Sequence, residues 1–265
     1  MVFSMLLNFL YPPPASAAIT AISAICLLAM INGGWMEVIG KNMQYSKLLR
    51  VDDATKEKPK VSVKLGMIGA YSPAFLAGFF SLLAFPIGDL RFALLRAAII
   101  LHFFKRLLEV LFVHKMSAMM EIEAMFAIST SYFLSSATMI YTQQLMIQLQ
   151  EPPIDLKYIG VSLFLVGIGG NFYHHFLLSK LRNKGEKQYK IPQGGLFSLV
   201  ICPHYLFEII GFLGISCISQ TVFSVCVGLG TTFYLMGRSY ATRRWYQSKF
   251  EDFPKDVKAL IPFIF

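Results

Sequence analysis

Residues 197–218 read FSLVICPHYLFEIIGFLGISCI, an apolar run long enough for a helix to cross a lipid bilayer. Near its middle it carries His204, Tyr205 and Glu208. A charged side chain at the bilayer centre costs about 3 kcal/mol, so an ionisable residue there indicates a functional site. His204 and Glu208 are four residues apart and share one helix face. The stretch predicts either a ligand pocket inside a helical bundle or a buried polar pair that ties two helices together.

The composition of the whole chain indicates an integral membrane protein. Of its 265 residues, 55% are hydrophobic and 15% are charged, whereas soluble domains carry about 25% charged residues. The four cysteines stand singly in apolar stretches, and their spacing fits neither a metal site nor a disulfide framework. The net charge of +9 is typical of basic cytosolic loops, so we expect a membrane partner and no nucleic acid.

The pattern of apolar runs predicts an all-α bundle of about seven transmembrane helices with a cytosolic C-terminal tail. Nineteen Lys and Arg residues fall on one side of these spans and two fall on the other. The positive-inside rule therefore places the C-terminus in the cytosol. Pro73 and Pro203 are expected to bend two of the spans. The expected spans are 17–35, 65–87, 92–114, 117–141, 156–178, 197–216 and 217–237.

The third expected span carries an unusual polar stripe. In LHFFKRLLEVLFVHK (101–115), His102, Lys105, Arg106 and Glu109 recur at spacings of three and four. They share one face of the helix, and both Lys105 and Arg106 can reach Glu109. These charges either line a site or extend from a helix end towards the membrane surface.

The fifth expected span ends in GIGGNFYHHFLLSKLR (167–182). Its glycines lie inside an apolar helix and follow no strand, so they indicate close helix packing rather than a dinucleotide-binding loop. Asn171, His174 and His175 cluster near the next basic loop. Adjacent histidines on a helix point about 100° apart and are poor joint metal ligands. We expect no metal here.

The tail beyond residue 237 is basic and aromatic, with Arg238, Arg244 and Tyr246. It either lies on the anionic cytosolic leaflet or holds phosphate groups through its arginines. Polar residues thus converge at the cytosolic ends of the last three spans. This order suits a long anionic cofactor whose reactive end is buried away from water. The residues alone leave NADPH and S-adenosylmethionine open, although five basic residues in the loop 179–196 favour the cofactor with more phosphates.

Three segments resemble the steroid 5α-reductase family, the 3-oxo-5α-steroid 4-dehydrogenases. They are NFYHHFLLSKLR (171–182), YKIPQGGLFSLVICPHYLFEIIGF (189–212) and GRSYATRRWYQSKFEDFPKDVKALIPFIF (237–265). The HFFKRLLEVLFVHK segment also resembles very-long-chain enoyl-CoA reductases, and PHYLFE resembles polyprenol reductases. The resemblance implies a seven-helix membrane enzyme that uses NADPH to reduce a carbon–carbon double bond conjugated to a carbonyl. It implies cofactor contacts for Arg106, Asn171, His175, Arg182, Tyr189, His204, Glu208, Arg238, Arg244 and Tyr246.

The chain departs from the family pattern at the catalytic positions. Steroid reductases place a Glu before a Pro on the second span and a Tyr after the His on the third, where this chain has Tyr71 and Phe103. A phenol at Tyr71 can still donate a hydrogen bond to a carbonyl, unless it is an ordinary buried tyrosine. Tyr71 and His102 are our candidate catalytic residues.

These observations lead to one hypothesis and two rivals. We expect an NADPH-dependent ene-reductase of the endoplasmic reticulum membrane. Residues 1–150 would form the lipid-substrate cavity, and residues 151–265 would bind NADPH. A steroid is the first choice of substrate, a very-long-chain enoyl-CoA the second and a polyprenyl compound the third. The rivals are a membrane methyltransferase and a non-catalytic sterol-binding protein.

Overall fold

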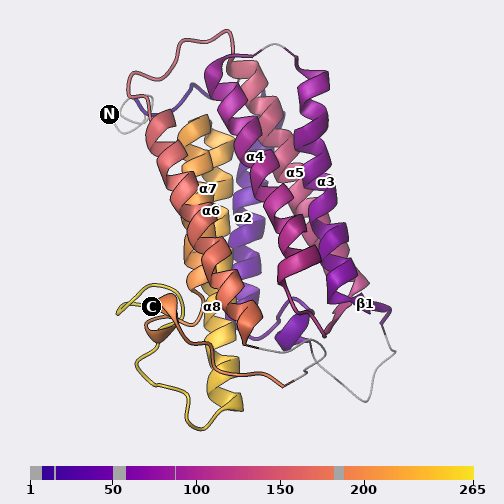
Figure 1. The fold of residues 1–265 in the computed structure, drawn as a ribbon. Coiled ribbons are helices and arrows are strands. Elements are labelled where there is room, and N and C mark those ends of the chain that lie inside the picture. The colour runs from indigo at the N-terminus through magenta and orange to yellow at the C-terminus, as the bar shows by residue number, and fades with distance from the viewer. Residues whose placement is uncertain (1–7, 15, 50–57, 87, 182–187) are drawn as a thin grey trace.

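The computed structural model describes residues 8–14, 16–49, 58–86, 88–181 and 188–265. Seven long helices run up and down in this part of the chain and form an elongated bundle (Figure 1). The prediction of a mostly helical fold is confirmed. The helices are α2 (Ala17–Val38), α3 (Val63–Ala84), α4 (Leu90–Leu108), α5 (Ile122–Met146), α6 (Lys157–Lys180), α7 (Pro203–Ser219) and α8 (Val222–Lys249).

Three of the described helices, α2, α3 and α6, are long and apolar enough to cross a membrane, and α7 is a shorter apolar helix. These helices support a multi-pass membrane protein, while seven spans and a cytosolic tail stay predictions.

Several helices begin at side-chain caps. Ser62, Asp89 and Thr221 accept hydrogen bonds from backbone N–H groups at the starts of α3, α4 and α8, which satisfies amides that have no partner within the helix.

Helix α7 begins later than the sequence predicts. Residues 197–202 lie outside it, in and after the short helix η3 (Gly195–Ser198), and Val200 forms a parallel bridge with Lys258. Pro203 is the first residue of α7, where its missing N–H costs no hydrogen bond, and the residue before a proline avoids helical geometry. The predicted start at residue 197 and the predicted bend at Pro203 were therefore wrong. His204 and Glu208 consequently lie in the first two turns of α7 rather than at its middle.

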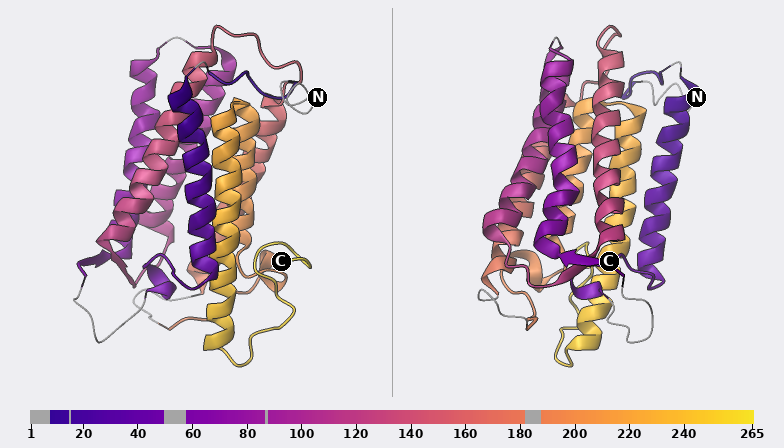
Figure 2. Two further views of the ribbon diagram at one scale, coloured as in Figure 1. Left: turned by 180° about the vertical axis from the view of Figure 1, so that it is seen from behind. Right: turned by 90° about the vertical axis from the view of Figure 1, so that its right-hand side faces the viewer.

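Helix α8 is longer than predicted, since it continues from Val222 to Lys249 instead of ending near residue 237. Its last turns project beyond the other helices (Figure 2), so they need not be apolar. The segment after it returns to the bundle. Arg243 Nε donates a 2.7 Å hydrogen bond to Val257 O, and Cys202 N donates one of 3.2 Å to Ala259 O. The C-terminal residues are therefore docked against α8 and the segment before α7.

The helices pack in two groups. Helices α3, α4 and α5 form the first group. In the second group α6 packs on α7, α7 on α8 and α2 on α8 (Figures 1 and 2). Helix α2 thus lies beside the C-terminal helices although it precedes residue 150, and the division of roles between 1–150 and 151–265 stays a prediction. Small residues permit the close approaches. A Cβ at Gly160 would lie 2.6 Å from Gly214 O, and one at Gly214 would lie 2.5 Å from Phe164 N.

The contact between α6 and α7 gives a test of this packing. Replacement of Gly167 by Ala is expected to destabilise the protein by about 1–3 kcal/mol, because the new Cβ would press on the Gly211 backbone and lie 2.8 Å from Phe207 O. Gly169→Ala is the matched control, because no atom lies within 4 Å of its added Cβ. Thermal denaturation in detergent measures both variants. Equal melting temperatures would contradict this account of the α6–α7 contact.

Short strands and loops gather at the lower end of the bundle in Figure 1. Strand β1 (Lys60–Ser62) pairs antiparallel with β2 (Met119–Glu121), with Val61 opposite Met120, and Tyr45 forms a further bridge to Met120. The short helix η1 (Ser46–Leu48) follows Tyr45, and the π-helix η2 (Glu109–Val113) extends α4 towards the same end. This pairing places the segments 43–48 and 114–118 next to each other.

The opposite end is held by the fully buried Arg91 at the start of α4. Its guanidinium donates hydrogen bonds to Ile218 O (2.8 Å) and Gln220 Oε1 (2.7 Å) at the α7–α8 turn. It also pairs with Glu151 (3.2 Å) and Asp155 (2.7 Å) in the α5–α6 loop. One side chain thus joins three segments that are distant in sequence.

Candidate active site

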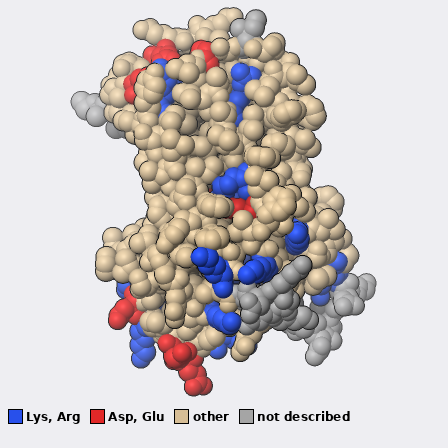
Figure 3. All heavy atoms as spheres, viewed as in Figure 1, with Lys and Arg blue, Asp and Glu red and all other residues tan. Residues whose placement is uncertain are grey.

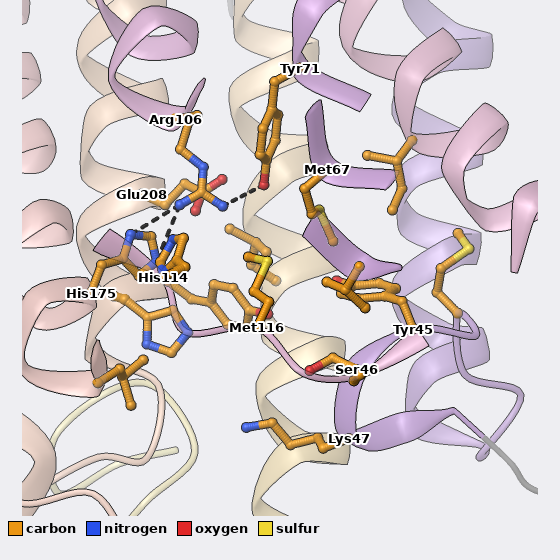
Figure 4. A pocket seen from close by; sticks show the side chains of 18 of the residues that line it. Tyr45, Ser46, Lys47, Met67, Tyr71, Arg106, His114, Met116, His175 and Glu208 are labelled. Atoms are coloured by element: carbon orange, nitrogen blue, oxygen red, sulfur yellow. Dashed lines mark hydrogen bonds between the residues drawn. The ribbon is translucent and has the colours of Figure 1, made fainter. Parts of the chain in front are cut away.

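A cavity of about 560 Å³ occupies the lower half of the bundle and takes lining residues from both helix groups (Figure 4). Tyr45, Lys47 and Lys115 line it near the loops, and Tyr71 and Arg106 line its inner end. Apolar side chains make up much of the remaining wall. They include Ala29, Met30, Val63, Met67, Ala127 and Ile128.

Arg106 is the centre of the polar network at the inner end of this cavity (Figure 4). Its Nη2 donates a 2.5 Å hydrogen bond to the Tyr71 hydroxyl, and its Nη1 lies 3.1 Å from Glu109 Oε2 and 3.0 Å from His175 Nδ1. Arginine has donors only, so the Tyr71 oxygen must accept. The Tyr71 proton is then left for a different acceptor.

A second row of polar groups supports this network from behind. Lys105 Nζ lies 3.0 Å from Glu109 and donates a hydrogen bond to Asn171 Oδ1. Asn171 in turn donates to His204 O (2.8 Å) and to Glu208 Oε2 (3.4 Å). The predicted contacts of Lys105 and Arg106 with Glu109 are confirmed. Two cations and two carboxylates therefore balance in charge within the bundle, as buried charges require.

One group of side chains has the composition of a metal site. Ligand atoms of Glu109, His114 and His175 all lie within 4.8 Å of one another. The Arg106 guanidinium already contacts Glu109 and His175 at 3.0–3.1 Å, and Lys105 adds a second cation. A divalent ion would have to displace this arginine against like-charge repulsion. We assign no metal here.

Seven of the twelve predicted site residues line the cavity, and they come from α3, α4, α6, α7, α8 and the segment before η3. They are Tyr71, Arg106, His175, Tyr189, His204, Glu208 and Tyr246.

Four of the other five lie elsewhere, and Arg182 lies outside the described residues. His102 is buried between the rings of Phe103 (4.9 Å) and Phe212 (5.0 Å), away from the cavity lining. Asn171 does not line the cavity but hydrogen-bonds to Lys105, His204 and Glu208 behind its lining. Arg244 is exposed, with its guanidinium 5.9 Å from the Tyr240 ring.

Arg238 is only 2% exposed and contacts protein groups rather than the cavity. Its Nη1 pairs with Glu37 at 2.8 Å and donates to Met43 O at 3.2 Å. Its guanidinium also lies 4.1 Å from the Tyr45 ring. Arg238 thus holds the loop that forms one wall of the cavity, a role that the resemblance does not imply.

The sequence did not single out Tyr45, Tyr132 or Tyr234, which also line the cavity. Aromatic residues are common in apolar helices, so nothing in the pattern separates Tyr132 and Tyr234 from packing residues. Tyr45 is a single aromatic residue in the segment before η1. Lys47 differs from these tyrosines because it lies in the stretch 41–64, which holds seven Lys and Arg residues. Its Nζ lies 4.7 Å from the Tyr246 ring, a cation–π contact that joins this loop to α8.

The apolar helices support a multi-pass membrane protein, and its bundle encloses a cavity with a buried charge network at one end. The chain belongs to the 3-oxo-5-alpha-steroid 4-dehydrogenase family, since the model of that family matches residues 114–265.

Curated relatives agree with this family. The chain is 40% identical over 112 residues to 3-oxo-5-alpha-steroid 4-dehydrogenase 2 of Sus scrofa, covering 42% of this chain and 44% of the relative. It is 43% identical over 107 residues to steroid 5-alpha-reductase DET2 of Gossypium hirsutum, covering 40% and 42%. It is 34% identical over 166 residues to very-long-chain enoyl-CoA reductase of Dictyostelium discoideum, covering 62% and 55%. The chain thus spans about half the length of the curated relatives it matches.

Proposed function

We propose that this protein is an NADPH-dependent reductase of a carbon–carbon double bond conjugated to a carbonyl in a lipid. The observation that carries the proposal is the Tyr71 hydroxyl at the inner end of the cavity. Its oxygen accepts a 2.5 Å hydrogen bond from Arg106, so its proton can be donated to a substrate oxygen. The names of the family and of its relatives support the same class of reaction.

The residues present suit a long anionic cofactor. Lys47, Lys115 and Lys190 line the cavity near the loops and supply cations for phosphate groups. Deeper in, His204 lines the cavity while its Nδ1 is buried and has no hydrogen-bond partner among the described residues. A buried orphan nitrogen of this kind suits a polar group of a ligand. When bound, NADPH would supply a hydride for the β carbon of the substrate.

The protein's own part in the reaction is to stabilise charge on the substrate. As the β carbon is attacked, negative charge develops on the carbonyl oxygen, and a fixed donor such as Tyr71 stabilises it. Arg106 stabilises the phenol as it gains negative character. The apolar wall excludes water and holds the lipid. A proton from solvent at the α carbon completes the reduction.

A steroid with a 4-en-3-one is our first choice of substrate, because the family model and several curated relatives carry that name. A very-long-chain enoyl-CoA is the second choice. It is favoured by the Dictyostelium relative, whose match covers 62% of this chain, and by the lysines near the loops, which can also bind phosphates of coenzyme A. A polyprenyl substrate is third.

We place the protein in the endoplasmic reticulum membrane with its loop-rich end in the cytosol. Most Lys and Arg residues visible in Figure 3 lie in the lower half of the molecule, where the cavity loops are. The positive-inside rule assigns such an end to the cytosol. NADPH would then enter from the cytosol and the lipid from the bilayer.

The proposal predicts NADPH oxidation by the purified protein in detergent. A 4-en-3-one steroid, an enoyl-CoA and a polyprenyl compound are run in parallel. Glu208→Gln is expected to abolish most of the turnover, because Glu208 lines the cavity and is bonded to Asn171. Glu251→Gln, an exposed carboxylate near the end of α8, is the control. Binding of S-adenosylmethionine in place of NADPH would identify a methyltransferase instead. NADPH binding without turnover of any substrate would indicate a non-catalytic sterol-binding protein.

A further inference from the structure

Tyr132, on α5, is a cavity residue to which the charge network assigns no role. Its ring lies 5.7 Å from the Tyr71 ring and 5.2 Å from the Phe103 ring, edge-on to the latter. The three aromatic side chains come from three helices, α5, α3 and α4. Tyr132 therefore stands beside the residue that carries the proposed function.

The Tyr132 hydroxyl makes no hydrogen bond to any described part of the chain, whereas the Tyr71 hydroxyl is bound by Arg106. A tyrosine hydroxyl inside a protein usually finds a partner, and Tyr132 is partly buried and lines the cavity. Packing against Tyr71 and Phe103 needs only a ring, and phenylalanine would supply it. The hydroxyl is thus available to a ligand in the cavity.

The surroundings of Tyr132 define the kind of ligand group that it can bind. Glu208, Tyr71, Arg106 and Tyr45 interact with it electrostatically. The Glu208 carboxylate cannot donate, and both Arg106 and Tyr71 can. A ligand atom between the two phenols therefore meets donors from both sides. A carbonyl oxygen, with two lone pairs, can accept both hydrogen bonds.

We propose that Tyr132 donates a second hydrogen bond to the carbonyl oxygen that Tyr71 polarises. This inference rests on the proposed function and narrows its substrate to a conjugated ketone or thioester. Hydride from NADPH forms the new bond at the β carbon, and the π electrons move onto the carbonyl oxygen between the two phenols. The enolate then collapses as the α carbon takes a proton from solvent. A polyprenyl alcohol is disfavoured as the substrate, because it has no carbonyl oxygen on which this negative charge can develop.

The test compares Tyr132→Phe with Tyr141→Phe, an exposed tyrosine on the same helix. Tyr132→Phe is expected to lower kcat about 100-fold with little change in KM, as removal of one oxyanion donor does. Tyr141→Phe should behave as the unaltered protein. If Tyr132 had only a structural role, Tyr132→Phe would instead lower the melting temperature. It would not lower kcat while leaving KM nearly unchanged.

A second readout needs no turnover. Hydrogen bonds to its oxygen shift the ultraviolet absorption of a conjugated enone to longer wavelength, which is measured for a 4-en-3-one steroid and an enoyl thioester bound with NADP⁺. We expect a shift in the unaltered protein and a smaller one in Tyr132→Phe. Normal kcat and an unchanged shift in Tyr132→Phe, with Tyr71→Phe impaired, would overturn the role of Tyr132 and leave the proposed function standing. The absence of both turnover and shift in the unaltered protein would overturn both.

Discussion

Tyr71→Phe is expected to lower kcat about 10²–10³-fold, the usual effect of removing a donor to a developing oxyanion. Phenylalanine keeps the ring contacts of Tyr71 with Phe103 and Tyr132. It removes only the hydroxyl, which accepts from Arg106 and is directed by that bond to donate elsewhere. KM should change little, because most of the binding surface is the apolar wall. Steady-state kinetics with the preferred substrate gives both constants.

The control for this substitution is Tyr158→Phe, which removes the hydroxyl of an exposed tyrosine on α6. It should leave both kinetic constants unchanged. Melting temperatures of the two variants establish that each is folded. If folded Tyr71→Phe retained full kcat, the carbonyl would be polarised by another group and the role given to Tyr71 would be wrong.

Arg91→Met is expected to destabilise the protein by about 2–4 kcal/mol, because two buried acceptors lose a donor, at about 1–3 kcal/mol each. The substitution strips the hydrogen bonds from Ile218 O and Gln220 Oε1 at the α7–α8 turn. It also leaves Glu151 and Asp155 with Lys157 as their remaining cation. Denaturation in detergent measures the loss.

Lys58→Met is the matched control, because Lys58 pairs with Glu123 at the surface, where both side chains are more than half exposed. A surface ion pair contributes about 0–1 kcal/mol. A loss in Arg91→Met no larger than that in Lys58→Met would show that Arg91 does not join the three segments.

The same cluster should make stability depend on acid. The hydrogen bond from Lys157, together with that from Arg91, holds the pKa of Glu151 below its ordinary value although partial burial opposes this. A carboxylate whose pKa is lowered by folding stabilises the protein above its unfolded pKa, about 4.3 for Glu. This contribution is lost as the pH falls through the folded pKa. Arg91→Met should therefore lose less stability than the unaltered protein on going from pH 6 to pH 3.

The sequence predicted the bundle well because membrane helices carry a strong hydropathy signal. It also predicted the contacts of Lys105 and Arg106 with Glu109, because residues three or four apart on a helix must meet. The start of α7 was missed because residues 197–202 are as apolar as the helix that follows, and only Pro203 marks the boundary. Burial in the docked C-terminal segment, rather than in lipid, explains their apolar character.

Contacts between segments that are distant in sequence could not be predicted from the sequence alone. Arg238 pairs with Glu37, 201 residues away, and no local spacing encodes that pair. Its contact with a cofactor stays a prediction. Tyr132 gave no signal, because one tyrosine in an apolar helix is typical of packing. The side chains of Glu109, His114 and His175 converge only through the packing of η2 against α6.

The central claim is that this protein transfers a hydride from NADPH to the β carbon of a conjugated lipid. The most direct measurement uses NADPH that carries deuterium at the transferable position, with the 4-en-3-one steroid and the enoyl-CoA as substrates, and locates the label in the product by mass spectrometry. The account predicts one deuterium at the β carbon of the saturated product. It also predicts that Tyr71→Phe forms this labelled product about 10²–10³-fold more slowly. Saturated product without deuterium, or NADPH that binds while every substrate remains unreduced, would contradict it.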